Sequence, residues 1–320
     1  MSVVLAAPDS FKGTFAAAEV AAAMGRGLRA AGRQAVELPV ADGGEGTLDV
    51  LARALGGERR RAAVHDPLGR PIEADFALLP DGRTAIVEAA RASGLGLVAE
   101  RERDAWAAST RGTGELIAAA ARAGAERVVV AVGGSAATDG GAGALEALDA
   151  AGVAVALDVV CDVRTPYEDA ARTFGPQKGA DAATVARLER RLHALAARLG
   201  RDPRGVPMTG AAGGLAGGLW AARGARLLAG APYVLDAVGF DARLRGAALV
   251  VTGEGRIDAQ TLAGKLVAEV AARCRRAGVA CHAIVGANAL DRAAQDALGL
   301  ASVREAATLA QIEASARALR

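Results

Sequence analysis

Aromatic residues are scarce in this chain of 320 residues, and its formal net charge is only +2. Two tryptophans, two tyrosines and five phenylalanines are too few for the stacking platform that binds single-stranded nucleic acid. The near balance of 38 basic and 36 acidic residues also lacks the electrostatic footprint of a nucleic-acid-binding surface. We therefore expect no nucleic acid among the partners of this protein.

Cysteines and long apolar runs are also scarce. The three cysteines, Cys161, Cys274 and Cys281, form no CxxC pair and no Cys/His spacing of a metal site. Glu146 and Asp149 interrupt the longest Ala/Val/Leu region, so no run reaches membrane-spanning length. The N-terminus lacks the basic start of a signal peptide. These absences predict a soluble, cytoplasmic protein that does not bind membranes.

Lysine is the rarest of the common charged residues here. Of the 38 basic residues only Lys12, Lys178 and Lys265 are lysines, and each is adjacent to a glycine. A compact ammonium is not interchangeable with a planar guanidinium where a phosphate or carboxylate is approached end-on. One such lysine could be present by chance, but three in glycine-flanked loops indicate a functional role for at least two.

Apolar runs that alternate with helical patterns predict a parallel sheet with crossover helices. The hydrophobic fraction of 52% suffices for a large core, and the length favours two domains. The pattern occurs near the N-terminus and returns near residue 236. The strands predicted on this basis are 3–7, 35–40, 248–252 and 282–285.

A different pattern separates these two parts. Residues 72–78 alternate in polarity and lead into a turn at Pro80-Asp81-Gly82, which predicts an antiparallel hairpin. The sequence therefore predicts an α/β fold. Residues 1–62 and 236–320 form a doubly wound parallel sheet domain, and residues 63–235 form an inserted second domain of mixed α/β structure.

The expected ligand site lies where the strand order of the parallel sheet reverses, beyond the carboxyl ends of the strands. For a 2-1-3-4-5 order this point lies between strands 1 and 3, next to loops 9–13 and 253–258, with loop 42–46 adjacent. All three loops are rich in glycine and carboxylates. A solvated polar turn explains any one of them, but three at one edge favour a functional site.

A further candidate is Gly133–Gly143, a glycine-rich loop between a strand and a helix. Such a loop exposes backbone N–H groups and directs a helix N-terminus at an anion. Ser135 and Thr138 add hydroxyl donors, and Asp139 could hold a metal ion that bridges phosphates. The segment 109–114 offers a weaker nest of this kind, for which a turn with a helix cap is an equally good explanation.

Absent motifs disfavour several enzyme classes. The chain has no GxxxxGK[ST] loop and no HRD or DFG triplet, which disfavours a P-loop enzyme and a protein kinase. The one string compatible with GxGxxA, at 25–30, falls inside a predicted helix, which makes a nicotinamide dehydrogenase a remote alternative. His65, His193 and His282 lie beside no obvious nucleophile, which disfavours a Ser–His hydrolase.

Seven motifs follow one another along nearly the whole chain and contain all three lysines. They are Ala7–Gly13, Pro39–Thr47, Ser109–Ile117, Val132–Gly143, Phe174–Ala180, Gly210–Gly214 and Val251–Lys265. Together they closely resemble the type I glycerate kinase family. The resemblance implies an ATP-dependent kinase that phosphorylates D-glycerate, with 2-phosphoglycerate favoured as the product. It also implies one flavodoxin-like and one inserted domain, with the active site in the cleft between them.

The chain also departs from the family pattern, in which members are usually longer. A segment that normally follows the helix after Gly133–Gly143 is largely missing, around 150–153, and the loop at 163–173 is short. Thr138 and Thr165 stand where asparagines are usual. These differences lie on the expected nucleotide side, so the resemblance specifies the acceptor more closely than the phosphoryl donor.

The resemblance and the chemistry of phosphoryl transfer together give four groups of expected site residues. The expected catalytic residues are Lys12, Asp42 and Asp9; the substrate-binding residues are Ser10, Arg256, Glu254, Asp258 and Lys265; the nucleotide-phosphate residues are Gly133, Gly134, Ser135, Thr138, Gly140 and Lys178; and the metal ligands are Asp139, Asp42 and Glu45. The expected cofactors are ATP as co-substrate and Mg²⁺.

Phosphoryl transfer requires mostly positioning and charge neutralisation. Lys12 would neutralise the transferring group or bind the glycerate carboxylate, and Arg256 offers a bidentate carboxylate clamp. Asp42 or Asp9 is the expected base, with Glu254 and Asp258 as alternates. Two other functions remain open, a kinase of another small hydroxy acid and a catalytically reduced ligand-binding relative. The chain is expected to be a monomer or a homodimer.

Overall fold

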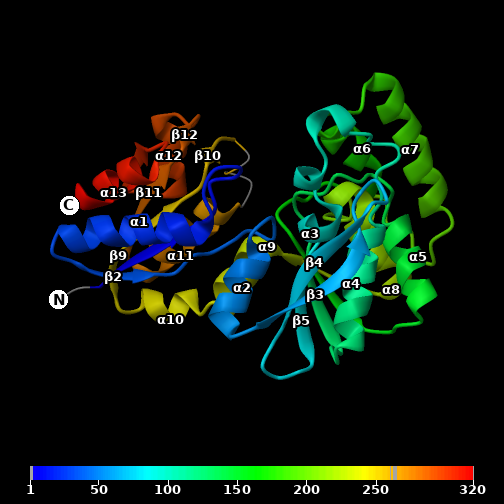
Figure 1. The fold of residues 1–320 in the computed structure, drawn as a ribbon. Coiled ribbons are helices and arrows are strands. Elements are labelled where there is room, and N and C mark those ends of the chain that lie inside the picture. Colours follow the sequence, from blue (N-terminus) through cyan, green and yellow to red (C-terminus); the bar gives the residue numbers. More distant parts are fainter. Residues whose placement is uncertain (1–2, 260, 262–264, 320) are drawn as a thin grey trace. The chain divides into compact units, whose positions relative to one another are not determined.

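Figure 1 shows the chain as a computed structural model that describes residues 3–259, 261 and 265–319. Contacts divide it into two compact units. The first unit consists of Met1–Asp42 and Ala231–Arg320, and the second unit is Gly43–Gly230. Each unit has its own sheet and its own hydrophobic core. No helix in the described ranges is long and apolar enough to cross a membrane.

These limits differ from the boundaries set from the sequence at 62/63 and 235/236. Helix α2 (Thr47–Leu55) packs on strands β4 (Pro71–Leu78) and β5 (Thr84–Glu88) of the second unit. Strand β3 (Glu58–His65) pairs with β4 along its whole length. A boundary at 62/63 would cut through β3, so the structure assigns residues 43–62 to the second unit.

The first unit contains a five-stranded parallel sheet in the order β13-β11-β9-β1-β2. Its strands are β1 (Val3–Pro8), β2 (Gln34–Glu37), β9 (Ala247–Gly253), β11 (Ala280–Val285) and β13 (Ser302–Glu305). Counted along this unit, the order is 2-1-3-4-5, so the doubly wound prediction is confirmed and the strand order reverses between β1 and β9. Strand β13 is the fifth strand of this count. A separate two-stranded parallel pair joins β10 (Arg256–Ile257) to β12 (Ala287–Asn288).

Apolar side chains on both faces hold this sheet between helices, as expected for buried parallel strands. Helices α1 and α13 lie side by side and share one core cluster with alternate residues of β1 and β9, such as Val4 and Val251. Helices α10 and α11 contact β9. The helices of this unit are α1 (Ala17–Ala30), α9 (Gly230–Ala237), α10 (Phe240–Leu244), α11 (Leu266–Ala277), α12 (Arg292–Leu298) and α13 (Leu309–Arg317).

The second unit contains a six-stranded mixed sheet in the order β3-β4-β5-β6-β7-β8. Strands β3, β4 and β5 form an antiparallel meander, which confirms the predicted hairpin. From β5 onward the neighbours are parallel. The remaining strands are β6 (Arg127–Ala131), β7 (Ala156–Cys161) and β8 (Arg226–Ala229). Strand β8 was not predicted from the sequence, because its four residues show no continuous buried run.

Helices α4, α5 and α8 supply the main core contacts of the second unit. Gly114 permits the close packing of α4 on α5, because a Cβ there would lie 2.4 Å from Ala144 O. The helices of this unit are α2, α3 (Ala90–Ser93), α4 (Arg111–Arg122), α5 (Ala142–Ala151), α6 (Ala170–Phe174), α7 (Ala182–Ala196) and α8 (Leu215–Arg223). Its 3₁₀ turns are η1 (Leu95–Leu97), η2 (Glu100–Glu102), η3 (Tyr167–Asp169), η4 (Pro176–Lys178) and η5 (Ala211–Gly214).

Candidate active site

The strand order of the first unit brings Asp9 and Asp42 to the same edge of its sheet. Two backbone N–H groups beyond β2, those of Leu38 and Val40, still donate to carbonyls of β1, at 2.8 and 3.0 Å. The chain therefore runs beside β1 as far as Val40. Asp9 N donates to Gly253 O at the end of β9, at 2.8 Å. Both aspartates are buried, and both follow the carboxyl end of a strand.

A tight turn after Asp9 presents Lys12. Phe11 and Phe15 exchange backbone hydrogen bonds of 2.8 and 3.0 Å, and Gly13 closes the turn with a φ of +77°, which favours glycine. Phe11 is buried in the core of the first unit. The Lys12 side chain is 55% exposed, and its Nζ lies 3.6 Å from Asp42 Oδ2. The turn thus places an accessible ammonium over a buried carboxylate.

The loop after β9 is fixed by backbone bonds to the segment after β11. Gly286 N donates to Glu254 O at 3.1 Å, and Ala287 N donates to Gly255 O at 3.0 Å. A Cβ on Gly286 would lie 2.5 Å from Gly255 O, so this close approach requires glycine. The pairing of β10 with β12 continues the contact. These bonds hold Glu254 and Arg256 in place at the reversal point of the sheet.

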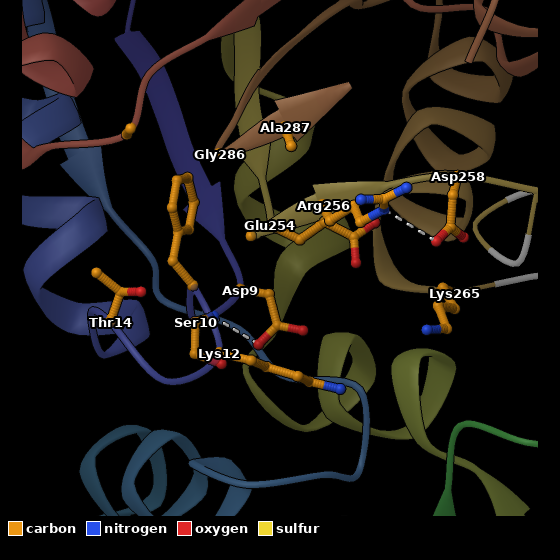
Figure 2. A pocket seen from close by; sticks show the side chains of 13 residues that line it. Asp9, Ser10, Lys12, Thr14, Glu254, Arg256, Asp258, Lys265, Gly286 and Ala287 are labelled. Atoms are coloured by element: carbon orange, nitrogen blue, oxygen red, sulfur yellow. Dashed lines mark hydrogen bonds and ion pairs between the residues drawn. The ribbon is translucent and has the colours of Figure 1, made fainter. Parts of the chain in front are cut away.

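These loops line a cavity of about 430 Å³ in the first unit. Figure 2 shows the side chains of Asp9, Glu254, Lys12, Arg256 and Lys265 around one common space. The volume is within the range of small-molecule sites. Acids and cations alternate around this space, an arrangement suited to a small ligand that carries both an anionic group and hydroxyl groups.

Burial and mutual repulsion raise the pKa of two carboxyl groups at this cavity. The pKa of Asp9 is well above its ordinary value because the side chain is buried and faces the charge of Asp42, although Lys12 partly opposes the shift. Burial raises the pKa of Glu254 to about 7, against the attraction of Lys265. Titratable groups shifted in this way inside a cleft are typical of functional sites.

Several contacts at the cavity were not predicted from the sequence. The most important of them are the hydrogen bonds of Thr261. Its hydroxyl donates to Glu254 Oε1 at 3.1 Å and accepts from Asp258 N at 3.2 Å, so it orients the glutamate. Arg256 Nε lies 3.5 Å from Asp258 Oδ2 (Figure 2). A single threonine in a loop gives no signal in the sequence. The sequence also predicts a helix from Leu262 to Arg276. Leu262 lies outside the described residues, which show α11 from Leu266.

Ser10 lines the cavity and carries a polar atom that needs a partner. Its backbone N donates to Asp9 Oδ1 at 2.6 Å. Its hydroxyl is buried and has no hydrogen-bond partner within the described ranges. A buried hydroxyl without a partner costs free energy, and a ligand hydroxyl or oxygen can supply the missing bond. The first unit thus gathers Lys12, Asp9, Ser10 and all of the expected substrate-binding residues at one cavity.

The second unit contains the expected nucleotide loop, and Glu45 lies against it. Gly133 N donates to Gly43 O at 3.3 Å, and a Cβ on Gly134 would lie 2.2 Å from Glu45 Oε1. Ser135 is buried, and its hydroxyl accepts from Ala137 N at 3.2 Å. The exposed Glu45 is therefore placed beside the glycine-rich turn.

Asp139 is positioned as a structural acceptor. Its carboxylate accepts from Thr110 N at 2.8 Å, Gly141 N at 3.0 Å and Gly143 N at 3.2 Å. The Thr110 hydroxyl adds a further donor at 2.9 Å. These donors lie at the N-termini of α4 and α5, where a carboxylate is stabilising. The Ser109 hydroxyl donates as well, at 3.3 Å. Five donors on one buried carboxylate leave little capacity for a metal ion, so we assign Asp139 to the loop framework.

Replacing Asp139 by asparagine is expected to lower the free energy of unfolding by about 2–4 kcal/mol, because several charge-assisted hydrogen bonds are lost. The loss should be the same with Mg²⁺ and with EDTA, as measured by urea unfolding. Asp149→Asn, at an exposed ion pair on helix α5 that follows this loop, is the matched control and should change stability by less than about 1 kcal/mol. Destabilisation that appears only with Mg²⁺ would return Asp139 to the metal ligands.

Comparisons with known proteins agree with this geometry. The sequence model of the glycerate kinase family matches residues 4–154 and 149–318. The two stretches overlap at residues 149–154, around the end of α5, where the chain is short relative to the family pattern. The chain is 40% identical to the glycerate kinase of Bacillus subtilis strain 168, over 90% of this chain and 86% of that protein. It is 39% identical to the glycerate 2-kinase of Escherichia coli K12, over 85% of this chain and 81% of that protein.

A solved structure supports the same assignment. A protein from Salmonella typhimurium LT2, described provisionally as glycerate kinase 2, matches with a TM-score of 0.81 and 35% identity, over 99% of this chain and 96% of that chain. The fold is that of a family of small-molecule kinases. The chain belongs to the glycerate kinase family and is an enzyme of that class.

Proposed function

We propose that this enzyme transfers the terminal phosphoryl group of ATP to D-glycerate and that 2-phosphoglycerate is the main product. The cavity at the strand reversal is the observation that supports glycerate as the acceptor. There, three cationic side chains surround two carboxyl groups of raised pKa, and they are Lys12, Arg256 and Lys265 around Asp9 and Glu254. The E. coli relative supports the choice of hydroxyl, since it is named a glycerate 2-kinase.

The cations of the cavity would bind the two anionic groups of the reaction. Arg256 presents a planar guanidinium that suits the glycerate carboxylate, because a carboxylate accepts two parallel N–H bonds. Lys12 is exposed above Asp42 and would neutralise charge on the transferring phosphoryl group. Ser10, with its buried hydroxyl, would bind a hydroxyl of the acceptor.

Glu254 is the carboxyl group best suited to act as general base. Its pKa of about 7 matches the operating range of a base at neutral pH, and Thr261 fixes its orientation. Asp9, Asp42 and Asp258 were the other candidates from the sequence. Asp9 is more deeply buried than Glu254 and accepts the backbone N–H of Ser10, which suits it to a fixed role.

The carboxyl groups of Asp9 and Asp42 fit a divalent cation. They repel each other, and this repulsion contributes to the raised pKa of Asp9, so a cation between them would be stabilising. Hard oxygen ligands of this kind suit Mg²⁺. Among the residues that the structure describes, no three His, Cys, Asp or Glu side chains are grouped as ligands of one ion, so phosphate oxygens and water would complete the coordination. Such an ion would neutralise phosphate charge.

The test is ADP release by the purified enzyme with ATP and Mg²⁺, with and without D-glycerate. Glycerate-dependent turnover supports the proposal, and phosphorus NMR of the product identifies the hydroxyl. L-Glycerate, lactate and other small hydroxy acids are the acceptor controls. Faster turnover with one of these would indicate a kinase of another hydroxy acid. If no acceptor is phosphorylated with any nucleoside triphosphate, the proposal is wrong.

A further inference from the structure

Lys178 is a buried cation that the sequence assigns only in general terms to the binding of nucleotide phosphates. It ends the 3₁₀ turn η4 in the second unit and is only 3% exposed. Its Nζ donates to Ala137 O at 2.5 Å and lies 3.4 Å from Thr138 Oγ1. Both partners belong to the loop Gly133–Gly143. The ammonium is therefore bonded to the framework of the loop.

The turn that presents Lys178 is itself rigid. Lys178 N and Ala180 N both donate to Gly175 O, at 2.9 and 3.1 Å. Gly179 has a φ of +90°, and a Cβ there would lie 3.1 Å from the Cβ of Arg103. The turn rests on an apolar cluster that includes Ala180 and residues of α6 and α7. The packing of the turn on this cluster therefore fixes the position of the Lys178 ammonium.

The same part of the loop is held from a second side by the segment around η5. A Cβ on Gly213 would lie 2.1 Å from Ala137 O, and Gly140 N donates to Gly213 O at 3.0 Å. Two non-glycine residues of this segment, Met208 and Ala212, have φ values of +76° and +52°. Such backbone strain persists only where the surroundings impose it, and it clusters at functional sites.

Burying the ammonium of Lys178 costs free energy because it loses its hydration. This cost indicates that the charge has a role in the protein. Burial lowers the pKa of Lys178 to about 7, and the attraction of Asp139 opposes the shift. A buried ammonium is tolerated only where hydrogen bonds compensate its lost hydration. The carbonyl of Ala137 and the hydroxyl of Thr138 supply these bonds. A compact ammonium meets a single carbonyl end-on, whereas the wide planar fork of arginine needs more room.

We propose that Lys178 is a positioning residue that fixes the backbone of Ala137 and Thr138 and thereby the shape of the loop Gly133–Gly143, without contacting the nucleotide. The inference rests on the proposed role of this loop in binding nucleotide phosphates. It replaces the expectation from the sequence that Lys178 itself binds a phosphate. The lysine would act before any ligand arrives, by keeping the N–H groups of the loop in a fixed arrangement.

The experiment compares Lys178→Met with wild type by hydrogen exchange of the nucleotide-free protein and by steady-state kinetics. Methionine has a similar length and no donor. Amides of residues 133–143 are expected to exchange at least about tenfold faster in the variant, because the loop opens locally. Exchange in β6 should not change. The KM for ATP should rise about tenfold and the KM for glycerate less than twofold.

Arg172→Met is the matched control, since it removes an exposed cation that pairs with Glu189 in the same region. It should leave both readouts unchanged. Lys178→Gln, which keeps an N–H donor, is the second variant and should fall between methionine and wild type. It also serves if Lys178→Met does not fold.

Two results would overturn the proposal. Unchanged exchange in the nucleotide-free variant together with weaker ATP binding would mean that Lys178 contacts the phosphates directly. Faster exchange with unchanged KM for ATP would mean that the loop does not bind nucleotide through the shape that Lys178 maintains. Failure of the proposed function is seen separately, because wild type would then show no ATP-dependent turnover.

Discussion

Replacing Lys12 by methionine is expected to reduce kcat by about 10²–10³-fold while the fold survives, because a preorganised charge at the transferring group is lost. The Lys12 side chain is 55% exposed and its turn is held by backbone bonds between Phe11 and Phe15. Loss of the ammonium therefore removes no core contact. The substitution does remove the ion pair with Asp42, for which we expect a stability change of less than about 1 kcal/mol.

The measurement is kcat and KM for both substrates, together with thermal unfolding. A fall in kcat with little change in KM would show that Lys12 acts mainly in the transition state. A rise in KM for glycerate alone would show instead that it binds the acceptor carboxylate. Arg26→Met, which removes an exposed cation of α1 paired with Glu313, is the matched control. Near-normal activity of the Lys12 variant would remove this residue from the active site.

The position of the site could be predicted from the sequence because it depends on topology. The apolar runs predict the strands, and the doubly wound class supplies the 2-1-3-4-5 order. The reversal between β1 and β9 then selects the loops that carry Asp9 and Glu254. Buried strands hold both ends of these loops at one edge of the sheet. The polar side chains of the loops therefore gather at that edge. The residues that the sequence places at this point therefore line one cavity of the first unit, and their roles stay predictions.

The roles of Asp139 and Lys178 could not be predicted in the same way. A glycine-rich loop indicates that an anion can bind, but residue type does not show which side chains face the ligand and which face the core. Both side chains are buried beneath the loop and bonded to its backbone or its helix ends. The boundary at 62/63 failed for a related reason. Strand β3 is mostly polar and only Val64 in it is buried, so its pairing with β4 leaves no apolar pattern in the sequence.

Replacing Glu254 by glutamine is expected to reduce kcat/KM for glycerate by about 10²–10⁴-fold at pH 8, because a positioned general base contributes about that much. Glutamine keeps the shape of the side chain and can still accept the hydrogen bond of Thr261. A base acts in its deprotonated form, and the pKa of Glu254 is raised to about 7. In wild type, kcat/KM should therefore fall about tenfold per pH unit below pH 7 and level off above it.

The two pH profiles decide the assignment. A limb near pH 7 that disappears in Glu254→Gln belongs to Glu254, whereas a limb that persists in the variant belongs to another group such as the nucleotide. A profile that the substitution leaves unaltered, with activity near that of wild type, would mean that Glu254 is not the base. Glu313→Gln, at an exposed ion pair of α13, is the control and should reproduce the wild-type profile.

The free energy of unfolding is a second, independent measure of the ionisation of Glu254. The Glu254→Gln substitution should raise this free energy although it lowers activity. The folded-state pKa of Glu254 is raised, so between about pH 4.5 and 7 the unfolded chain loses its proton first and the folded state becomes less stable as pH rises. Glutamine carries no such cost. Glu254→Gln should therefore be more stable than wild type by about 3 kcal/mol at pH 8 and equal to it near pH 4. A variant that loses activity and gains stability at pH 8 would show that the active site holds a carboxylate at the expense of the fold.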